Sequence, residues 1–273
     1  MQEFDKKELK KLYIPPGNSH KGQNGKLLLI SGSKLFHSSS LWALKIASRI
    51  VDMVFYSSVP ENNQLAMEAK NEFRDGIIVP RNKIENYIQE ADCILIGPGL
   101  PRANGEEEGD DKTKELTRRL LKKYPEKKWV IDGGSLQVID PKIIPQNAII
   151  TPHSREFKQL FGLEVSSENV EKMSQKYGLV IVTKGPTDFV CSPSKCVSVK
   201  GGNAGMTKGG TGDVLAGLIA ALYCKNDDPF LVASAGSYIN KKAGESLFEK
   251  VGYYFNSSDL VNEIPRVMKN LIA

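Results

Sequence analysis

The sequence has 273 residues, of which 40% are hydrophobic and 25% are charged, and its formal net charge is +5 at pH 7. These proportions are ordinary for a globular protein, and one large α/β domain can reach this length. Basic residues alternate with acidic ones, so the charge argues weakly for small anionic ligands and against nucleic acid. No run of about 18 apolar residues exists, and the N-terminal residues are charged, which predicts a cytoplasmic protein without a membrane anchor.

Short apolar runs predict the strands of a mostly parallel sheet that is buried on both faces. Each run is followed by Gly, Ser, Pro or Asp, as such strands require. The runs are 26–31, 53–58, 93–97, 128–132, 148–152 and 179–184. Between them, residues 39–50, 113–124 and 154–162 place apolar side chains three and four apart, which is typical of amphipathic helices. We therefore predict a layered α/β fold.

Residues 188–199 have a different pattern. They alternate between apolar and polar side chains, break at Ser-Pro-Ser and alternate again, which predicts an antiparallel hairpin added to the parallel sheet. No linker rich in Pro, Gly or Ser divides the chain. We therefore predict one domain over residues 25–273, preceded by an N-terminal arm of residues 1–24.

The four cysteines share no C-x-x-C spacing, and three histidines add little material for a zinc site. We predict that Cys93, Cys191, Cys196 and Cys224 are all reduced thiols. A bond between Cys191 and Cys196 across the predicted hairpin is the alternative, which a reducing compartment disfavours.

The segment from Gly201 to Leu222, GGNAGMTKGGTGDVLAGLIAAL, combines glycines with the start of a predicted helix. A helix N-terminus offers unpaired N–H groups and partial positive charge, and glycines allow an anion to approach closely. The pattern matches neither the P-loop nor G-x-G-x-x-G after a first strand. The segment therefore predicts an anion site of another class.

Asp213 stands at the junction between these glycines and the helix. A carboxylate there repels a phosphate unless it has a task. It could be a first-turn acid that the helix dipole stabilises, or a general base that takes a proton from a substrate hydroxyl beside a phosphoryl group. The segment alone leaves both interpretations open.

Six segments together follow, in order, the pattern of one known family. They are HKGQNGKLLLISGS (20–33), ILIGPGL (94–100), VIDGGSL (130–136), ITPHSREFKQL (150–160), VIVTKGPTDFV (180–190) and GGNAGMTKGGTGDVLAG (201–217). The chain resembles the ADP- or ATP-dependent NAD(P)H-hydrate dehydratases of the ribokinase-like superfamily, from about His20 onward. The resemblance implies a three-layer αβα sandwich.

The resemblance also implies a lyase of metabolite repair. It implies dehydration of the S epimers of NADHX and NADPHX, the hydrated forms of NADH and NADPH, while ADP or ATP is split. The implied route is phosphorylation of the C6 hydroxyl with Asp213 as base, followed by elimination of phosphate. Magnesium, a homo-oligomeric state and a separate NAD(P)HX epimerase as pathway partner are further implications.

Individual positions can be carried over from the family. Ser39, Gly99, His153 and Asp213 fall on positions that contact the hydrated dinucleotide. The positions implied for the nucleotide are Lys184, Gly185, Pro186, Thr187, Asp188, Gly209, Gly210, Thr211 and Gly212.

Several of these residues also have ordinary structural interpretations. Considered alone, His153 is equally well explained as a helix cap or a surface residue, and Lys184 as a strand-end lysine. Gly97 and Gly99 are explained by a tight turn. For Glu156 we favour a capping role over the organisation of magnesium through water.

Three places depart from the family pattern. HSSS replaces the usual Gly-Ala, which puts Ser39 where a small Ala touches the substrate and adds His37 and Ser38. DGGSL replaces Asp-Ala-Asp-Ala-Leu, so that Asp132 is kept and Gly134 stands where the second acid is usual. RIVDMVFYSS lacks customary glycines.

Two other functions remain open from the sequence. A ribokinase-like kinase of a small alcohol, such as a thiazole or hydroxymethylpyrimidine vitamin precursor, fits the glycine segment and Asp213 equally well. A non-catalytic nucleotide-binding regulator places no demand on Asp213.

Overall fold

The computed structural model describes residues 1–71, 73–102, 110–146 and 148–272. These residues form one ten-stranded sheet in the order β1-β10-β9-β8-β7-β6-β5-β2-β3-β4. The strands are β1 (Gln2–Glu3), β2 (Lys26–Ile30), β3 (Met53–Ser57), β4 (Ile77–Ile78), β5 (Cys93–Ile96), β6 (Lys128–Ile131), β7 (Ile149–Ile150), β8 (Val180–Thr183), β9 (Asp188–Cys191) and β10 (Cys196–Val199). The helices are α1 (His37–Ala47), α2 (Pro60–Glu68), α3 (Ile84–Glu90), α4 (Thr113–Lys123), α5 (Gly133–Val138), α6 (Ser154–Phe161), α7 (Ser167–Tyr177), α8 (Thr211–Lys225), α9 (Pro229–Val251) and α10 (Ser257–Ile272).

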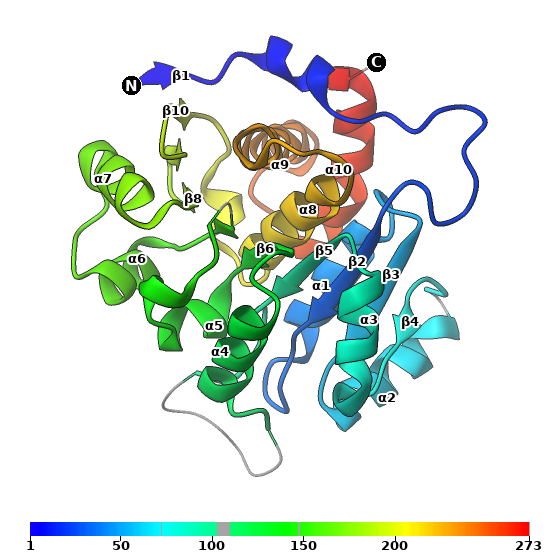
Figure 1. Cartoon of the computed structure of the whole chain (residues 1–273). Helices are drawn as coiled ribbons and strands as arrows, with labels where there is room; N and C mark the ends of the chain where they lie inside the picture. Colours follow the sequence, from blue (N-terminus) through cyan, green and yellow to red (C-terminus); the bar gives the residue numbers. More distant parts are fainter. Residues whose placement is uncertain (72, 103–109, 147, 273) are drawn as a thin grey trace.

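The sheet is parallel from β4 to β8, and β9 is antiparallel to both of its neighbours. All six predicted runs form strands, and the predicted hairpin is β9–β10. Side chains alternate across the sheet, so Leu27 and Leu29 face one apolar layer while Leu28 and Ile30 face the other. The first layer holds α1, α8, α9 and α10, and the second holds α3 to α7, as Figure 1 shows. The predicted αβα sandwich with a mostly parallel sheet is therefore confirmed.

The residues of the predicted N-terminal arm lie against this sandwich. β1 adds a parallel strand to the sheet beside β10 (Figure 1). Leu9 and Leu12 are buried, and the Phe4 ring packs on Tyr238 at a centroid distance of 5.5 Å. The Tyr13 amide donates to Asn226 Oδ1 at 2.8 Å. The arm thus shares the core of the domain that follows it.

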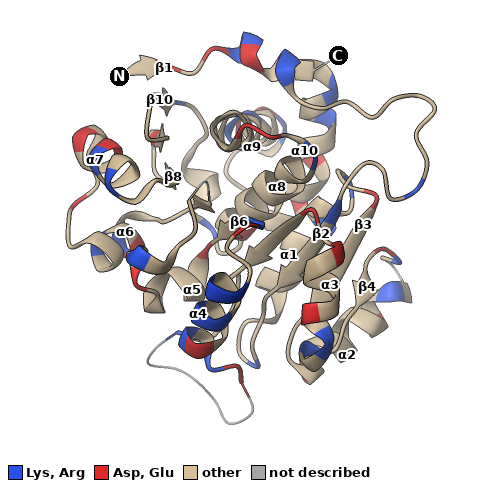
Figure 2. Ribbon diagram, in the orientation of Figure 1, with Lys and Arg blue, Asp and Glu red and all other residues tan. Residues whose placement is uncertain are grey.

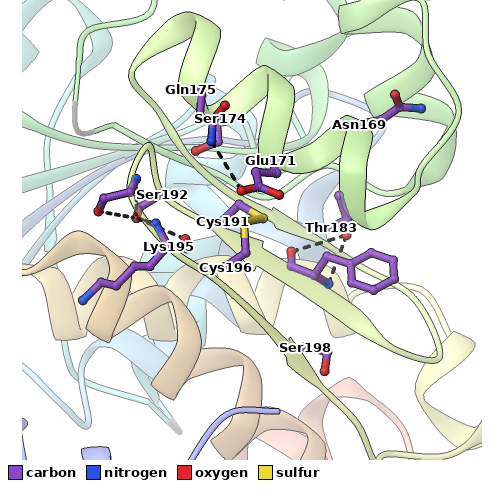
Figure 3. Close-up of a disulfide and its surroundings, with 12 residues drawn as sticks. Asn169, Glu171, Ser174, Gln175, Thr183, Cys191, Ser192, Lys195, Cys196 and Ser198 are labelled. Atoms are coloured by element: carbon purple, nitrogen blue, oxygen red, sulfur yellow. Dashed lines mark hydrogen bonds between the residues drawn. A yellow bond between two sulfur atoms is a disulfide. The ribbon is translucent and has the colours of Figure 1, made fainter. Parts of the chain in front are cut away.

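The hairpin corrects the expectation for the cysteines. Cys191 and Cys196 are directly opposite each other in the antiparallel pair, with Cα atoms 4.1 Å apart, and they form a disulfide (Figure 3). The prediction of four reduced thiols was wrong for this pair, because register brings the two residues together. Cys93 and Cys224 are free and buried.

Helix α8 is the most deeply buried helix of the first layer, with every residue from Val214 to Cys224 covered. A Cβ on Gly217 would lie 2.9 Å from the Ala43 Cα, so glycine lets α8 approach α1 closely. Figure 2 shows the charged residues of both signs interspersed over the outer helices, with few on α8. None of the helices in the described ranges is long and apolar enough to cross a membrane.

Candidate active site

The predicted site residues meet at the carboxyl ends of the parallel strands. Gly97 follows β5, Asp132 follows β6 and His153 follows β7. Lys184 follows β8 and forms an isolated parallel bridge with His153. The N-terminus of α8 arrives at the same edge. Open α/β sheets bind ligands outside this edge, so local strand endings explain why distant sequence motifs converge here.

Two cavities lie at this edge and share Lys184 and Gly212. The first has a volume of about 490 Å³, and all four positions implied for the dinucleotide line it: Ser39, Gly99, His153 and Asp213. Asp132 and Glu156 line it too.

The second cavity has a volume of about 530 Å³. Besides the shared Lys184 and Gly212, four positions implied for the nucleotide line it: Gly185, Pro186, Asp188 and Thr211. Lys241, which the sequence did not single out, lines it too. Gly209 and Gly210 line the first cavity instead, and Thr187 lines neither. The two sets of predicted positions are thus largely divided between two adjoining spaces.

Gly210 explains the need for bare backbone before α8. It is the N-cap of the helix, with φ of +95°, and no side chain caps the first turn. A Cβ at this position would lie 2.2 Å from Cζ3 of the Trp42 ring. Both the positive φ and the close ring therefore favour glycine. At Gly212, a Cβ would lie 3.3 Å from Lys184 Nζ, so the start of α8 and the lysine border one space.

Lys184 is held by one acid that follows β6 and one acid of α6. Its Nζ lies 2.7 Å from Asp132 Oδ1 and 4.0 Å from Glu156 Oε2. Asp132 is buried and also accepts from Thr151 Oγ1 at 2.8 Å. Burial opposes the charged form of Lys184, but Asp132, Glu156 and Asp213 together raise its pKa. The lysine is therefore a fixed positive charge between the two cavities.

Asp213 lies in the first turn of α8 and faces this lysine across the site. Burial and the charge of Asp132 raise the pKa of Asp213 to about 7, against the opposing effects of Lys184 and a hydrogen bond with Ser39. A carboxyl group with this pKa can take up or release a proton near neutral pH. The geometry thus combines the first-turn position with the properties of an acid–base group.

His153 and Glu156 form a capping box at the start of α6. His153 Nδ1 accepts from the amides of Arg155 and Glu156, and Glu156 Oε2 accepts from the His153 amide at 3.0 Å. The capping role expected for Glu156 is confirmed. Because Nδ1 is an acceptor, the proton of a neutral His153 ring lies on Nε2. Nε2 lies 3.5 Å from Glu156 Oε1, and its N–H is the group that His153 can offer to a ligand of the first cavity.

The structure shows how two residues that depart from the family pattern, Gly134 and Ser39, fit into the site. A Cβ on Gly134 would lie 2.2 Å from the Leu100 carbonyl oxygen, so an acid does not fit there while the chain after β5 runs so close. Gly97 and Gly99 have φ of +123° and +67°, as the tight-turn interpretation expects. Ser39 contributes the hydrogen bond to Asp213. Gly134 and Ser39 are therefore accommodated inside the site.

Lys241 of α9 and the pairing of Asp132 with Lys184 were missed by sequence reasoning. A signal for Lys241 existed, since Ser237, Asn240, Lys241 and Gly244 recur at helical spacing within an apolar stretch. A lysine on that stripe needs buried partners. Within the described ranges, no cluster of three or more His, Cys, Asp or Glu side chains has the arrangement of a metal site.

Comparison with known proteins gives a consistent family. A family model described as NAD(P)H-hydrate dehydratase matches residues 27–266. The chain is 37% identical, over 96% of its length, to 52% of the bifunctional NAD(P)H-hydrate repair enzyme Nnr of Methanocaldococcus jannaschii. It is 32% identical to the ADP-dependent (S)-NAD(P)H-hydrate dehydratase of Cenarchaeum symbiosum, covering 92% of this chain and 91% of that one.

The chain spans about half the length of the bifunctional relatives that it matches. Among solved structures, the ADP/ATP-dependent NAD(P)H-hydrate dehydratase of Bacillus subtilis, co-crystallized with ATP/Mg²⁺, superposes with a TM-score of 0.81. It is 21% identical and covers 99% of this chain and 98% of that one, which supports the fold.

Proposed function

Because the chain belongs to the NAD(P)H-hydrate dehydratase family, we propose that it dehydrates S-NADHX and S-NADPHX to NADH and NADPH at the expense of ADP or ATP. One observation carries this proposal. Asp213, with a pKa of about 7, lines the first cavity, which adjoins the second cavity at Lys184 and Gly212. Acid–base chemistry on one ligand can therefore be coupled to phosphoryl transfer from the other.

The two ligands would meet beside Lys184 and Gly212. The terminal phosphate of the nucleotide lies against the first turn of α8, whose N–H groups and partial positive charge favour an anion. Lys184 adds a fixed positive charge at the same place. The C6 hydroxyl of the dinucleotide lies beside Asp213 in the first cavity. His153, through its Nε2–H, and Ser39 flank this ligand.

The proposed reaction begins with Asp213 taking the proton of the C6 hydroxyl. The oxygen then forms a bond to the terminal phosphorus, and the bond from that phosphorus to the bridging oxygen breaks, which releases AMP from ADP or ADP from ATP. The lone pair of the ring nitrogen next expels phosphate, which leaves with both electrons of the C6–O bond. Loss of a proton from C5 completes the double bond of NADH.

Magnesium fits this site through the nucleotide rather than through a cage of side chains. Asp132, Glu156 and Asp213 line the first cavity together with Lys184 and Arg102, so one negative charge remains to attract a cation when Asp213 is ionised. Mg²⁺ usually keeps several waters and binds through substrate phosphates with one or two carboxylates. Asp132 and Glu156 would hold it through water, and it would neutralise phosphate charge.

The pathway partner, the location and the oligomeric state of the protein are part of the same proposal. The family resemblance leads us to expect an NAD(P)HX epimerase as a partner in the same repair pathway. We also expect the protein to be cytoplasmic and to form a homo-oligomer.

The test is recovery of NADH absorbance from S-NADHX and magnesium with ADP, with ATP and without nucleotide. Nucleotide-dependent recovery is expected. Consumption of nucleotide with a small alcohol but not with S-NADHX would favour the kinase function. Nucleotide binding without turnover of any substrate would favour the regulator.

A further inference from the structure

A buried lysine lies at the second cavity. Lys241 of α9 is only 5% exposed. Its Nζ donates to the carbonyl oxygens of Gly185 at 2.9 Å, Pro186 at 3.2 Å and Gly201 at 3.3 Å. Gly185 and Pro186 follow β8, whereas Gly201 follows β10, and all three line the cavity. One ammonium group therefore joins two separate segments of the cavity wall.

Asp188 completes the arrangement. Its Oδ1 lies 3.2 Å from Lys241 Nζ and accepts from the Gly185 amide at 2.9 Å, while its Oδ2 accepts from Ser237 Oγ at 2.7 Å. Both carboxylate oxygens are thus engaged inside the protein. Burial raises the pKa of Asp188, and Lys241 opposes that rise. The pair is a buried contact that fixes the turn from Lys184 to Asp188.

The charge of Lys241 also matters for a ligand of the second cavity. Three carbonyl oxygens and one carboxylate would present negative charge to the phosphates of a nucleotide. The ammonium group offsets this charge from within the wall, where electrostatic interactions are weakly screened. The residue has so many protein acceptors that direct binding of the nucleotide is not its task.

We propose that Lys241 is a positioning residue for the nucleotide: it joins the segments after β8 and β10 and neutralises the wall that they form. This inference rests on the proposed function, since it takes the occupant of the second cavity to be ADP or ATP. The dinucleotide cavity does not include Lys241. Substitution of Lys241 should therefore weaken the binding of the nucleotide but not that of the dinucleotide.

The test is calorimetric titration of the wild-type protein and of Lys241→Met with ADP and with ATP, without dinucleotide. A rise of about tenfold or more in Kd is expected for Lys241→Met. The KM for S-NADHX at saturating nucleotide should stay within about twofold, because its cavity is untouched. The matched control is Lys250→Met on the same helix, whose Nζ pairs with Glu263 at 2.6 Å outside both cavities. This control should keep wild-type nucleotide affinity.

Lys241→Met leaves the buried carboxylate of Asp188 without its positively charged partner, which can destabilise the fold. The double variant Lys241→Met/Asp188→Asn removes both charges and therefore best preserves folding. This double variant should unfold near the wild-type temperature and still bind ADP about tenfold more weakly. Wild-type affinity in either variant would overturn the inference. If the wild-type protein itself binds neither nucleotide, the proposed function fails, and the inference fails with it.

Discussion

Asp213 is subject to opposing electrostatic effects. The N-terminus of α8 favours its ionised form, whereas burial and Asp132 favour the neutral form and bring the pKa to about 7. A general base works best when its pKa lies near the operating pH, because it is then both available and sufficiently basic. The environment of this one carboxyl group therefore suits proton transfer at neutral pH.

The substitution Asp213→Asn keeps the shape of the side chain and removes the base. We expect kcat to fall by about 10²- to 10⁴-fold, the usual contribution of general base catalysis. Nucleotide affinity should change little. Steady-state kinetics with S-NADHX and calorimetry with ADP measure the two quantities, and a variant with wild-type kcat would contradict the role of Asp213.

The raised pKa of Asp213 also affects stability. Between the ordinary pKa near 4 and the folded value of about 7, the folded state binds more protons than the unfolded state. The free energy of unfolding contributed by this group therefore falls as pH rises through that window. Asp213→Asn should melt at a higher temperature than wild type at about pH 8, and the difference should vanish at about pH 4. Thermal scans at both pH values test this, and equal melting at the higher pH would argue against the raised pKa.

Single residues were predictable from the sequence where a motif carried them. Ser39, Gly99, His153 and Asp213 all line the first cavity, because each follows a strand or opens a helix at one edge of the sheet. Lys241 was not predictable in this way. Its partners come from β8 and β10, and only the packing of α9 brings them to its ammonium group.

At the scale of elements, the start of α8 depends on backbone conformation. Gly210→Ala would force a side chain into positive φ and against Trp42, so we expect a loss of about 1–3 kcal/mol in the free energy of unfolding. Gly209→Ala is the matched control, because its Cβ would meet nothing within 4 Å. That variant should lie within about 0.5 kcal/mol of wild type. Urea denaturation measures both, and equal losses would exclude the conformational explanation.

The disulfide stabilises the hairpin at the end away from the nucleotide wall. Cys191 and Cys196 are five residues apart, so the closed loop is short and its entropic contribution is about 2 kcal/mol. A reductant should lower the free energy of unfolding by about that amount in wild type and have no effect on Cys191→Ala/Cys196→Ala. Nucleotide affinity should be equal in both proteins. A loss of affinity on reduction would show that the hairpin transmits strain to the cavity.

The elements themselves differed in how far the sequence predicted them. The long buried strands and the hairpin were visible because continuous apolar runs and strict alternation are local patterns. The short strands β1 and β4 were not visible, since two residues carry no periodicity and only their neighbours define them. The cysteine pair was predicted to be reduced because a reducing compartment disfavours disulfides, although the predicted hairpin allowed the bond that the structure contains.

At the scale of the whole molecule, the two cavities give each proposed ligand its own space. Among the residues that the structure describes, Lys184 and Gly212 line both cavities. We therefore expect NADH to inhibit competitively against S-NADHX but not against ADP, and AMP to show the reverse. Product-inhibition kinetics measure these patterns. Competition between NADH and ADP would indicate that one cavity serves both ligands.

The pairing of β1 with β10 has a consequence for how the molecule folds. Gln2 and Glu3 pair with Val197 and Ser198, so strands from distant parts of the sequence must find each other. Contacts of such long range form slowly, because closing the intervening loop costs entropy before it gives any stabilisation. Until β1 docks, the outer edge of β10 exposes unpaired backbone groups, and such an edge can pair with another chain. Aggregation during refolding is therefore expected to compete with the docking of β1.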